Sequence, residues 1–195
     1  MNISRLLMAA LLSGSALAQA VAQEDRADFR DGLGYDPSPA YPFGRPNPGA
    51  SAELLEFDFF VGAFDCFDRI SIGNGQFRET QAIWNGAYFL NGYGIQDQYW
   101  ANGLMTSNIR MYDARDGLWK VTFFSAPNYS TGTWVGGKEG DDMVLRRETE
   151  LPDGRIRVGR LTFHDISDNG FEWKAETVMD GEVTATNWTS SCKRR

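Results

Sequence analysis

The residues that could support thiol, metal or acid–base chemistry are few in this chain and lie far apart. The 195 residues include two cysteines, Cys66 and Cys192, and one histidine, His164. A structural zinc site needs three or four cysteine or histidine ligands, and the two cysteines do not form a Cys-x-x-Cys pair. In the segment RLTFHDI, Leu161 and Phe163 share one face of an alternating pattern, so we expect His164 on the other face, beside a turn. We therefore predict no metal, no haem and no other cofactor.

Carboxylates that could act as a general acid or base are present, but none has a distinctive setting in the sequence. Asp97, Asp113, Glu148 and Asp165 lie near predicted turns or beside basic residues, where a solvated charge is the ordinary outcome. General acid–base catalysis requires such a group to be held in a cavity with a shifted pKa. The sequence also shows no Ser-His-Asp set and no phosphate-binding loop. Whether the protein is an enzyme stays open, and the catalytic residues are unassigned.

Aromatic side chains are the more prominent chemical feature. The chain contains 13 phenylalanines, 7 tyrosines and 6 tryptophans. Binding pockets combine apolar walls with a few convergent polar groups, and tryptophan and tyrosine each add a polar atom to a large apolar surface. Core packing is the alternative role for every one of them. The predicted ligand-binding residues, all aromatic or arginine, are Trp84, Arg110, Tyr112, Trp119, Tyr129, Trp134, Arg146, Trp173 and Trp188.

Short segments with a two-residue period predict the elements that position these side chains. Runs rich in aromatic and β-branched residues alternate with turn sequences such as IGNGQ, LPDGR and MDGEV. They predict one short helix after Ser51 and strands over 62–72, 76–85, 87–99, 103–113, 118–126, 130–136, 142–150, 154–164, 170–178 and 183–192. So many strands in one small domain would leave open edges unless the sheet closes. We therefore predict an all-β fold, a closed antiparallel β-barrel of about ten strands.

The N-terminal part of the chain differs from the predicted barrel. Residues 1–22 combine a positive charge at Arg5, a short apolar run and small residues before a predicted cleavage site after Ala22, which is typical of a secretory signal peptide. Residues 23–52 are rich in proline and glycine, and we expect this aromatic-containing segment to lie against the domain. The barrel domain is predicted over 53–195. The protein is thus expected in the periplasm or outside the cell.

Charge and hydropathy exclude two classes of partner. The formal net charge is −7, and no basic stripe is present, so we expect no nucleic-acid binding. The apolar run from Leu6 to Leu12 is too short to span a bilayer as a helix, and no later segment is longer, so we predict no transmembrane segment. The oligomeric state is not indicated by the sequence.

Barrel closure would bring the two cysteines together. It places the first strand, which carries Cys66, beside the last strand, which carries Cys192. Disulfides form in oxidising compartments such as the periplasm. We therefore predict a Cys66–Cys192 disulfide, with two separate buried thiols as the alternative.

Alternation along single strands predicts which side chains face the interior. In FEWKAE, residues 171–176, the apolar positions alternate with charged ones, so Trp173 is predicted to point inward. Residues 108–112 carry plausible interior residues on both faces, and the choice between the faces stays open. A barrel of this size either fills with its own side chains or holds one small ligand.

Several short motifs resemble a known family. FDFFVGAF places a glycine two residues before an aromatic residue, which is similar to the GxW opening of lipocalin-like barrels, with Phe64 at the tryptophan position. The motifs NGAYFLNGY, SNIRMYDARDGLW and GRLTFHDISDNGFEW, in this order, resemble the bacterial domain-of-unknown-function family 1579 over about residues 54–194. The resemblance implies an exported, lipocalin-like (calycin-type) barrel and no established activity. It also implies that a basic residue near the end of the last strand, Lys193 or Arg194, stacks over Phe64.

These observations favour a binding function over a catalytic one. We expect an exported β-barrel that takes a small apolar or aromatic molecule into its cavity. An enzyme that uses the cavity for a lyase, isomerase or hydrolase step is the first alternative. A structural or partner-binding protein is the second, supported by the aromatic residues within 23–52.

Overall fold

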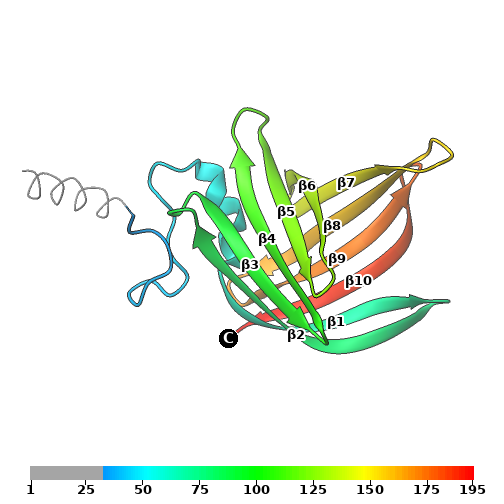
Figure 1. Cartoon of the computed structure of the whole chain (residues 1–195), viewed down its shortest axis with the longest axis horizontal. Helices are drawn as coiled ribbons and strands as arrows, with labels where there is room; N and C mark the ends of the chain where they lie inside the picture. The colour runs from blue at the N-terminus through cyan, green and yellow to red at the C-terminus, as the bar shows by residue number, and fades with distance from the viewer. Residues whose placement is uncertain (1–32) are drawn as a thin grey trace, which may run out of the picture. The chain divides into compact units, whose positions relative to one another are not determined.

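The barrel closes between its first and last strands. The structure is a computed structural model that describes residues 33–195, so the predicted signal peptide and the beginning of the 23–52 segment lie outside the described residues. Within residues 35–195, each strand pairs antiparallel with its neighbours in sequence, and β1 (Gly62–Gly73) pairs with β10 (Glu182–Arg194). The predicted all-β closed barrel of ten strands is therefore confirmed (Figure 1).

The strand boundaries agree with the sequence pattern to within a few residues, apart from one hairpin. The remaining elements are η1, a 3-10 helix (Ala52–Phe60), β2 (Gln76–Phe89), β3 (Gly94–Ala101), β4 (Leu104–Asp113), β5 (Leu118–Ala126), β6 (Ser130–Glu139), β7 (Asp142–Glu150), β8 (Ile156–Ser167) and β9 (Gly170–Met179).

The exception lies between β2 and β3. The sequence predicts a strand break near Gly86, whereas β2 continues through it and the turn follows at residues 90–93. Gly86 lies against η1, and a Cβ atom at this position would be 2.3 Å from the carbonyl oxygen of Phe60. The glycine is thus required for the close approach of the helix to the barrel and not for a turn.

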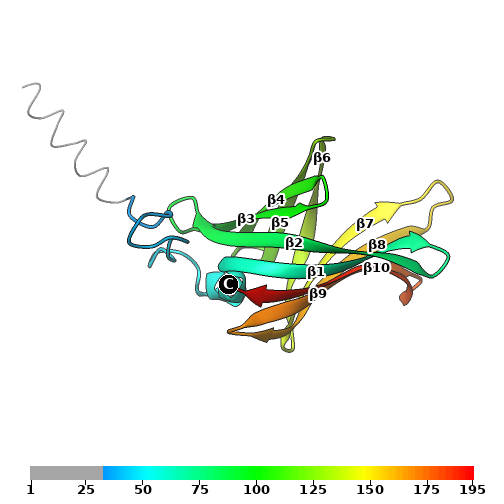
Figure 2. The same cartoon turned by 90° about the horizontal axis from the view of Figure 1, so that it is seen from below.

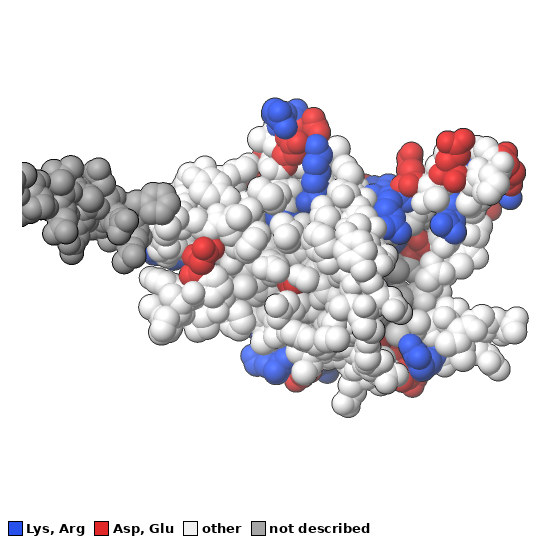
Figure 3. All heavy atoms as spheres, viewed as in Figure 1, with Lys and Arg blue, Asp and Glu red and all other residues white. Residues whose placement is uncertain are grey.

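Other hairpin turns match the sequence signals. Both residues of Asn74–Gly75 and of Asp180–Gly181 have positive φ angles. This is the geometry of type I′ turns, whose twist matches that of the flanking strands, and Asn-Gly and Asp-Gly adopt it readily. In the face shown in Figure 3, charged side chains gather at the top, at the upper right and along the lower edge, with uncharged surface between them.

Helix η1 covers one end of the barrel. Figure 2 shows it at the end of the barrel where β10 ends at the C-terminus, and hydrogen bonds from Arg194 to Phe59 and Val61 join the two. Phe57 and Phe60 of the helix are fully buried, and the Phe57 ring lies 4.7 Å from that of Trp119 on β5. Arg194 of β10 donates to the carbonyl oxygens of Phe59 and Val61, at 2.9 and 2.6 Å. The helix is thereby attached to the strand that completes the barrel.

The two contacts predicted at the closure are present. Cys66 of β1 and Cys192 of β10 are direct partners in the strand register, with Cα atoms 4.1 Å apart, and they form a disulfide. The guanidinium of Arg194 lies 4.7 Å from the centre of the Phe64 ring. The predicted disulfide is confirmed, and Arg194, not Lys193, is the basic residue over Phe64.

Residues 35–51 lie along the β2–β3 hairpin. The carbonyl of Phe43 accepts a hydrogen bond from the backbone N–H of Tyr88 at 2.8 Å, and the N–H of Asn47 donates to the carbonyl of Gly92 at 3.0 Å. This part of the proline-rich segment is therefore attached to the barrel, as expected. In residues 33–195 no helix has both the length and the apolar character needed to cross a bilayer.

Candidate ligand cavity

A cavity of about 380 Å³ lies inside the barrel. Nine of the ten strands, β2 to β10, contribute side chains to its lining. Successive residues of a strand point to opposite faces of the sheet, so the lining residues of one strand are mostly two positions apart. Its wall consists mainly of aromatic and aliphatic groups with a few polar ones. The lining residues are Trp84, Tyr99, Leu104, Thr106, Asn108, Arg110, Val121, Phe123, Ser125, Trp134, Leu145, Leu161, Phe163, Trp173, Ala175, Trp188 and Ser190.

Three tryptophans form a continuous row on one side of this cavity. The ring of Trp173 lies 5.8 Å from that of Trp84 and 5.4 Å from that of Trp188, with interplanar angles of 87° and 89°. Tyr99 contacts both outer members of the row at 5.5 Å. Such edge-to-face packing fixes the ring orientations and so gives the wall a defined shape.

A buried ion pair lies at the end of the cavity nearest η1. Arg110 of β4 and Asp97 of β3 are 2% and 1% exposed, and Nη1 of the arginine lies 2.6 Å from Oδ2 of the aspartate. The carboxylate also accepts hydrogen bonds from the backbone and side-chain nitrogens of Asn108, at 2.8 to 3.0 Å. The guanidinium is 4.3 Å from the ring centre of Phe60. The pair is formally neutral, which makes its burial tolerable.

This ion pair corrects the expectation that Asp97 is solvated. Asp97 is an inward residue of β3, two positions from the buried residues Ile95 and Tyr99. The inward face of β4, left open by the sequence, is the one that carries Asn108 and Arg110, because these two residues line the cavity.

A second buried carboxyl, Asp68 of β1, was not indicated by the sequence analysis. It is fully buried, and its two oxygens accept hydrogen bonds from the hydroxyls of Ser190, at 2.5 Å, and Tyr99. Burial raises the pKa of Asp68, although the hydrogen bonds from Ser190, Tyr99 and Trp188 oppose this shift. Burial and the neighbouring Asp68 also raise the pKa of Tyr99. The alternation in β1 could have predicted that Asp68 points into the barrel, because it puts Asp68 on the same face as Cys66.

Several buried N–H groups of the wall have no hydrogen-bond partner within residues 33–195. They are Nε1 of Trp84, Nε1 of Trp173 and Nε of Arg110. Nη1 of Arg110 contacts Asp97 as an ion pair without hydrogen-bond alignment. Nε1 of Trp188 also lacks a hydrogen-bond partner within residues 33–195, although this indole favours the ionised form of Asp68 and so lowers the pKa of that carboxyl.

The structure brings together five of the nine predicted ligand-binding residues. These five line the cavity: Trp84, Arg110, Trp134, Trp173 and Trp188. Trp173 is inward, as the alternation in β9 predicts.

Two of the other four predicted residues belong to the closed end of the barrel. Trp119 is fully buried beneath η1 and donates from Nε1 to Oε2 of Glu56 at 3.0 Å. Tyr112 packs against it with ring centres 5.7 Å apart. Both side chains fill the space between the helix and the barrel wall, because η1 covers the part of the interior they face, and they do not line the cavity.

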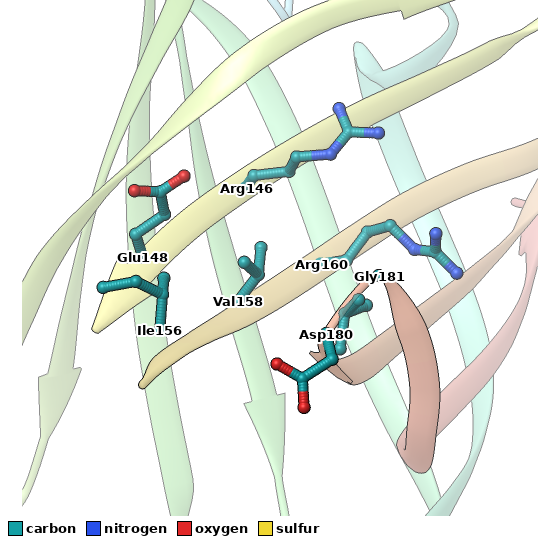
Figure 4. A pocket seen from close by; sticks show the side chains of 8 residues that line it. Arg146, Glu148, Ile156, Val158, Arg160, Asp180 and Gly181 are labelled. Carbon is teal, nitrogen blue, oxygen red and sulfur yellow. The ribbon is translucent and has the colours of Figure 1, made fainter. Parts of the chain in front are cut away.

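The last two predicted residues lie on the outside. Tyr129 is 78% exposed and sits in the β5–β6 turn. Arg146 lies on the face of β7 opposite Leu145, where it pairs with Glu139. Figure 4 shows Arg146 in an outer groove of about 550 Å³ that it shares with Arg160 and other residues of β7 to β9. The prediction that Arg146 lines the cavity is not met, because Leu145 takes the inward position of β7 and its neighbour Arg146 therefore lies on the outer face.

Arg147, which was not predicted, lies near the end of the cavity away from η1. Its guanidinium is 4.7 Å from the ring centre of Trp134 and 5.4 Å from that of Phe123, both of which line the cavity. Gly132 leaves room for it, because a Cβ atom there would be 2.3 Å from Nη1 of Arg147. Arg147 makes no ion pair with any residue of 33–195.

His164 lies on the face of β8 opposite Phe163 and contacts Asp165, with Nδ1 2.8 Å from Oδ2. It is not among the residues that line the cavity. In the part of the chain that the structure describes, no group of three or more histidine, cysteine, aspartate or glutamate side chains is arranged to hold a metal ion.

Comparisons with known proteins add little to this geometry. No family model matches the chain, and no curated protein matches it. One similar solved structure is the S-type phycobiliprotein lyase of Guillardia theta, with 12% sequence identity and a TM-score of 0.46. The match covers 74% of this chain and 98% of that chain. Membership of family 1579 therefore stays a prediction from the sequence motifs.

Proposed function

We propose that the protein is an exported binding protein that takes one small apolar or aromatic molecule into the barrel. The observation that carries this proposal is the cavity of about 380 Å³, whose wall is mostly aromatic and aliphatic. Ligand pockets typically measure about 300–1,000 Å³ and combine apolar walls with a few polar groups. The cavity lies at the lower end of this range, which favours a ligand of two or three fused rings over a long lipid.

Export is part of the proposal. The predicted signal peptide supports it, and so does the Cys66–Cys192 disulfide, because such bonds persist in oxidising compartments. The resemblance to the exported family 1579 points to the same location, the periplasm or the medium.

The enzyme alternative has weaker support. Asp68 is a buried carboxyl with a raised pKa beside the cavity, which is a setting that catalytic acids also show. However, both of its oxygens are bonded to Ser190 and Tyr99, and its side chain is fully buried behind them. Asp97 is likewise occupied by Asn108 and Arg110. A general base must reach the proton that it removes, and neither carboxyl is free to do so.

Binding can be tested directly with N-phenyl-1-naphthylamine, an uncharged probe whose fluorescence rises in apolar surroundings. We expect saturable binding with one site per chain. Trp173→Ala should weaken it by about 30-fold or more, the loss typical of a hot-spot aromatic. Trp119→Ala is the matched control, because Trp119 is also buried but does not line the cavity.

Two results would contradict the proposal. One is no saturable fluorescence change with the folded native protein. The other is equal weakening by the two tryptophan variants, which would assign Trp173 to core packing. Thermal unfolding of each variant separates lost binding from lost folding, and native mass spectrometry of exported material would show any ligand that the protein retains.

A further inference from the structure

We propose that the ligand is an uncharged aromatic molecule that carries a hydrogen-bond acceptor, such as a ketone or quinone carbonyl, bound at the η1 end of the cavity. This inference rests on the proposed binding function and specifies the chemistry of the ligand. The buried donors of Trp84, Trp173 and Arg110 are the groups that would receive the acceptor.

The first argument is the balance of donors and acceptors in the wall. Nε1 of Trp84, Nε1 of Trp173 and Nε of Arg110 are buried without a partner in the described residues. Buried polar groups in proteins are nearly always paired, and each exception calls for an explanation. In contrast, all oxygens of Asp68 and Asp97 already accept hydrogen bonds or ion-pair contacts. The wall therefore offers unpaired hydrogen-bond donors, the N–H groups of Trp84, Trp173 and Arg110, which a ligand can pair with an acceptor.

The second argument is that the side chains that carry these donors lie close together. Trp84 packs on Phe60 of η1 with ring centres 4.9 Å apart, and the guanidinium of Arg110 lies 4.3 Å from the same ring. Trp173 is the next member of the tryptophan row, 5.8 Å from Trp84. These side chains thus gather at the η1 end, while Leu104 and Phe123 line the rest of the cavity together with the hydroxyl residues Thr106 and Ser125. A bound molecule would place its carbonyl at that end and its hydrocarbon part away from it.

The third argument concerns charge. Arg110 is already neutralised by Asp97, with 2.6 Å between Nη1 and Oδ2. A ligand carboxylate beside Arg110 would also lie close to the negative charge of Asp97, and burying a charge without its own counter-ion is strongly unfavourable. The η1 end therefore favours a neutral acceptor over an anion. The competing cation is Arg147, which stacks on Trp134 near the other end.

Three naphthalene compounds of similar size separate these possibilities. They are 2-acetonaphthone, which has a neutral carbonyl, 2-isopropylnaphthalene, which lacks an acceptor, and 2-naphthoate, which is an anion. Their affinities can be measured by calorimetry and by displacement of N-phenyl-1-naphthylamine. We expect the ketone to bind about 10-fold more tightly than the hydrocarbon, in line with one or two net hydrogen bonds, and more tightly than the anion.

Conservative variants identify which N–H group causes the preference for the ketone over the hydrocarbon. Trp84→Phe and Trp173→Phe keep an aromatic ring but remove the N–H, so at least one of them should lower the ketone-to-hydrocarbon preference by about 3- to 10-fold. Trp119→Phe is the control, because its N–H is held by Glu56 outside the cavity, and the preference should not change. The ratio of two affinities is insensitive to a general loosening of the barrel, and thermal unfolding checks that each variant folds.

The outcomes are distinct. Equal binding of the ketone and the hydrocarbon overturns the inference but leaves the binding function intact. Tightest binding of 2-naphthoate, lost in Arg147→Gln, also overturns it and assigns an anionic ligand to the other end of the cavity. No binding of the fluorescent probe or of any naphthalene compound overturns the proposed function and this inference together.

Discussion

The buried pair of Arg110 and Asp97 offers a stringent test of how the interior is arranged. Replacing Asp97 by alanine removes the counter-ion of Arg110, which is only 2% exposed. It also removes the acceptor of the Asn108 backbone N–H. We therefore expect Asp97→Ala to be among the most destabilising single substitutions outside the aromatic core.

The magnitude follows from the burial of both partners. Removing one partner of a buried ion pair lowers the free energy of unfolding by about 3–5 kcal/mol, because the remaining charge is uncompensated. Replacing both partners by apolar residues of similar size, as in Asp97→Leu/Arg110→Met, is often neutral or stabilising. The Asn108 N–H is unpaired in Asp97→Ala and in the double variant alike, so its cost of about 1–3 kcal/mol cancels between them. We expect the double variant to be about 3–5 kcal/mol more stable than Asp97→Ala.

Urea denaturation at pH 7, followed by circular dichroism, measures these differences. Glu79→Ala is the control, since Glu79 forms a pair with Arg69 in which both side chains are more than half exposed, at 57% and 52%. Such surface pairs contribute about 0–1 kcal/mol. If Asp97→Ala costs no more than Glu79→Ala, or the double variant is less stable than Asp97→Ala, the reasoning about the interior is refuted.

Further expectations concern the closure of the barrel, the second buried carboxyl and the N-terminus. Replacing Cys66 and Cys192 by alanine should lower the free energy of unfolding by up to about 5 kcal/mol, because the bond closes a loop of 126 residues in the unfolded chain; labelling of the native protein by a thiol reagent without reductant would contradict the bond. The raised pKa of Asp68 means that its contribution to stability is full below pH 3.8 and is lost as the pH rises through the folded-state pKa. The stability of the native protein relative to Asp68→Asn should therefore fall from pH 4 to pH 7 in urea titrations, and a rise would show the opposite pKa shift. N-terminal sequencing of exported protein should begin near Gln23, whereas Met1 would argue against cleavage.

The strands, their order and the disulfide could be predicted because the forces behind them leave local marks. Alternation places apolar side chains on one face of a strand, and pairs such as Asn74–Gly75 mark turns that few other residues adopt. Once the strands form a meander, an unpaired edge is unfavourable, so closure and the neighbourhood of Cys66 and Cys192 follow. The inward orientation of Trp173 was predicted in the same way, from its charged neighbours.

The candidate cavity was decided by contacts between residues far apart in the chain. Both Trp84 and Trp119 contact phenylalanines of η1, yet only Trp84 also borders the cavity, because the helix and the closed end of the barrel surround Trp119. Arg110 and Asp97 lie on neighbouring strands, and their pairing depends on the register of β3 and β4. Alternation specifies which residues share a face, but the packing of all ten strands and the helix determines which of these faces is filled and where a polar group finds its partner. The sequence by itself therefore determined the barrel and its closure, and the tertiary structure decided which inward residues surround a cavity.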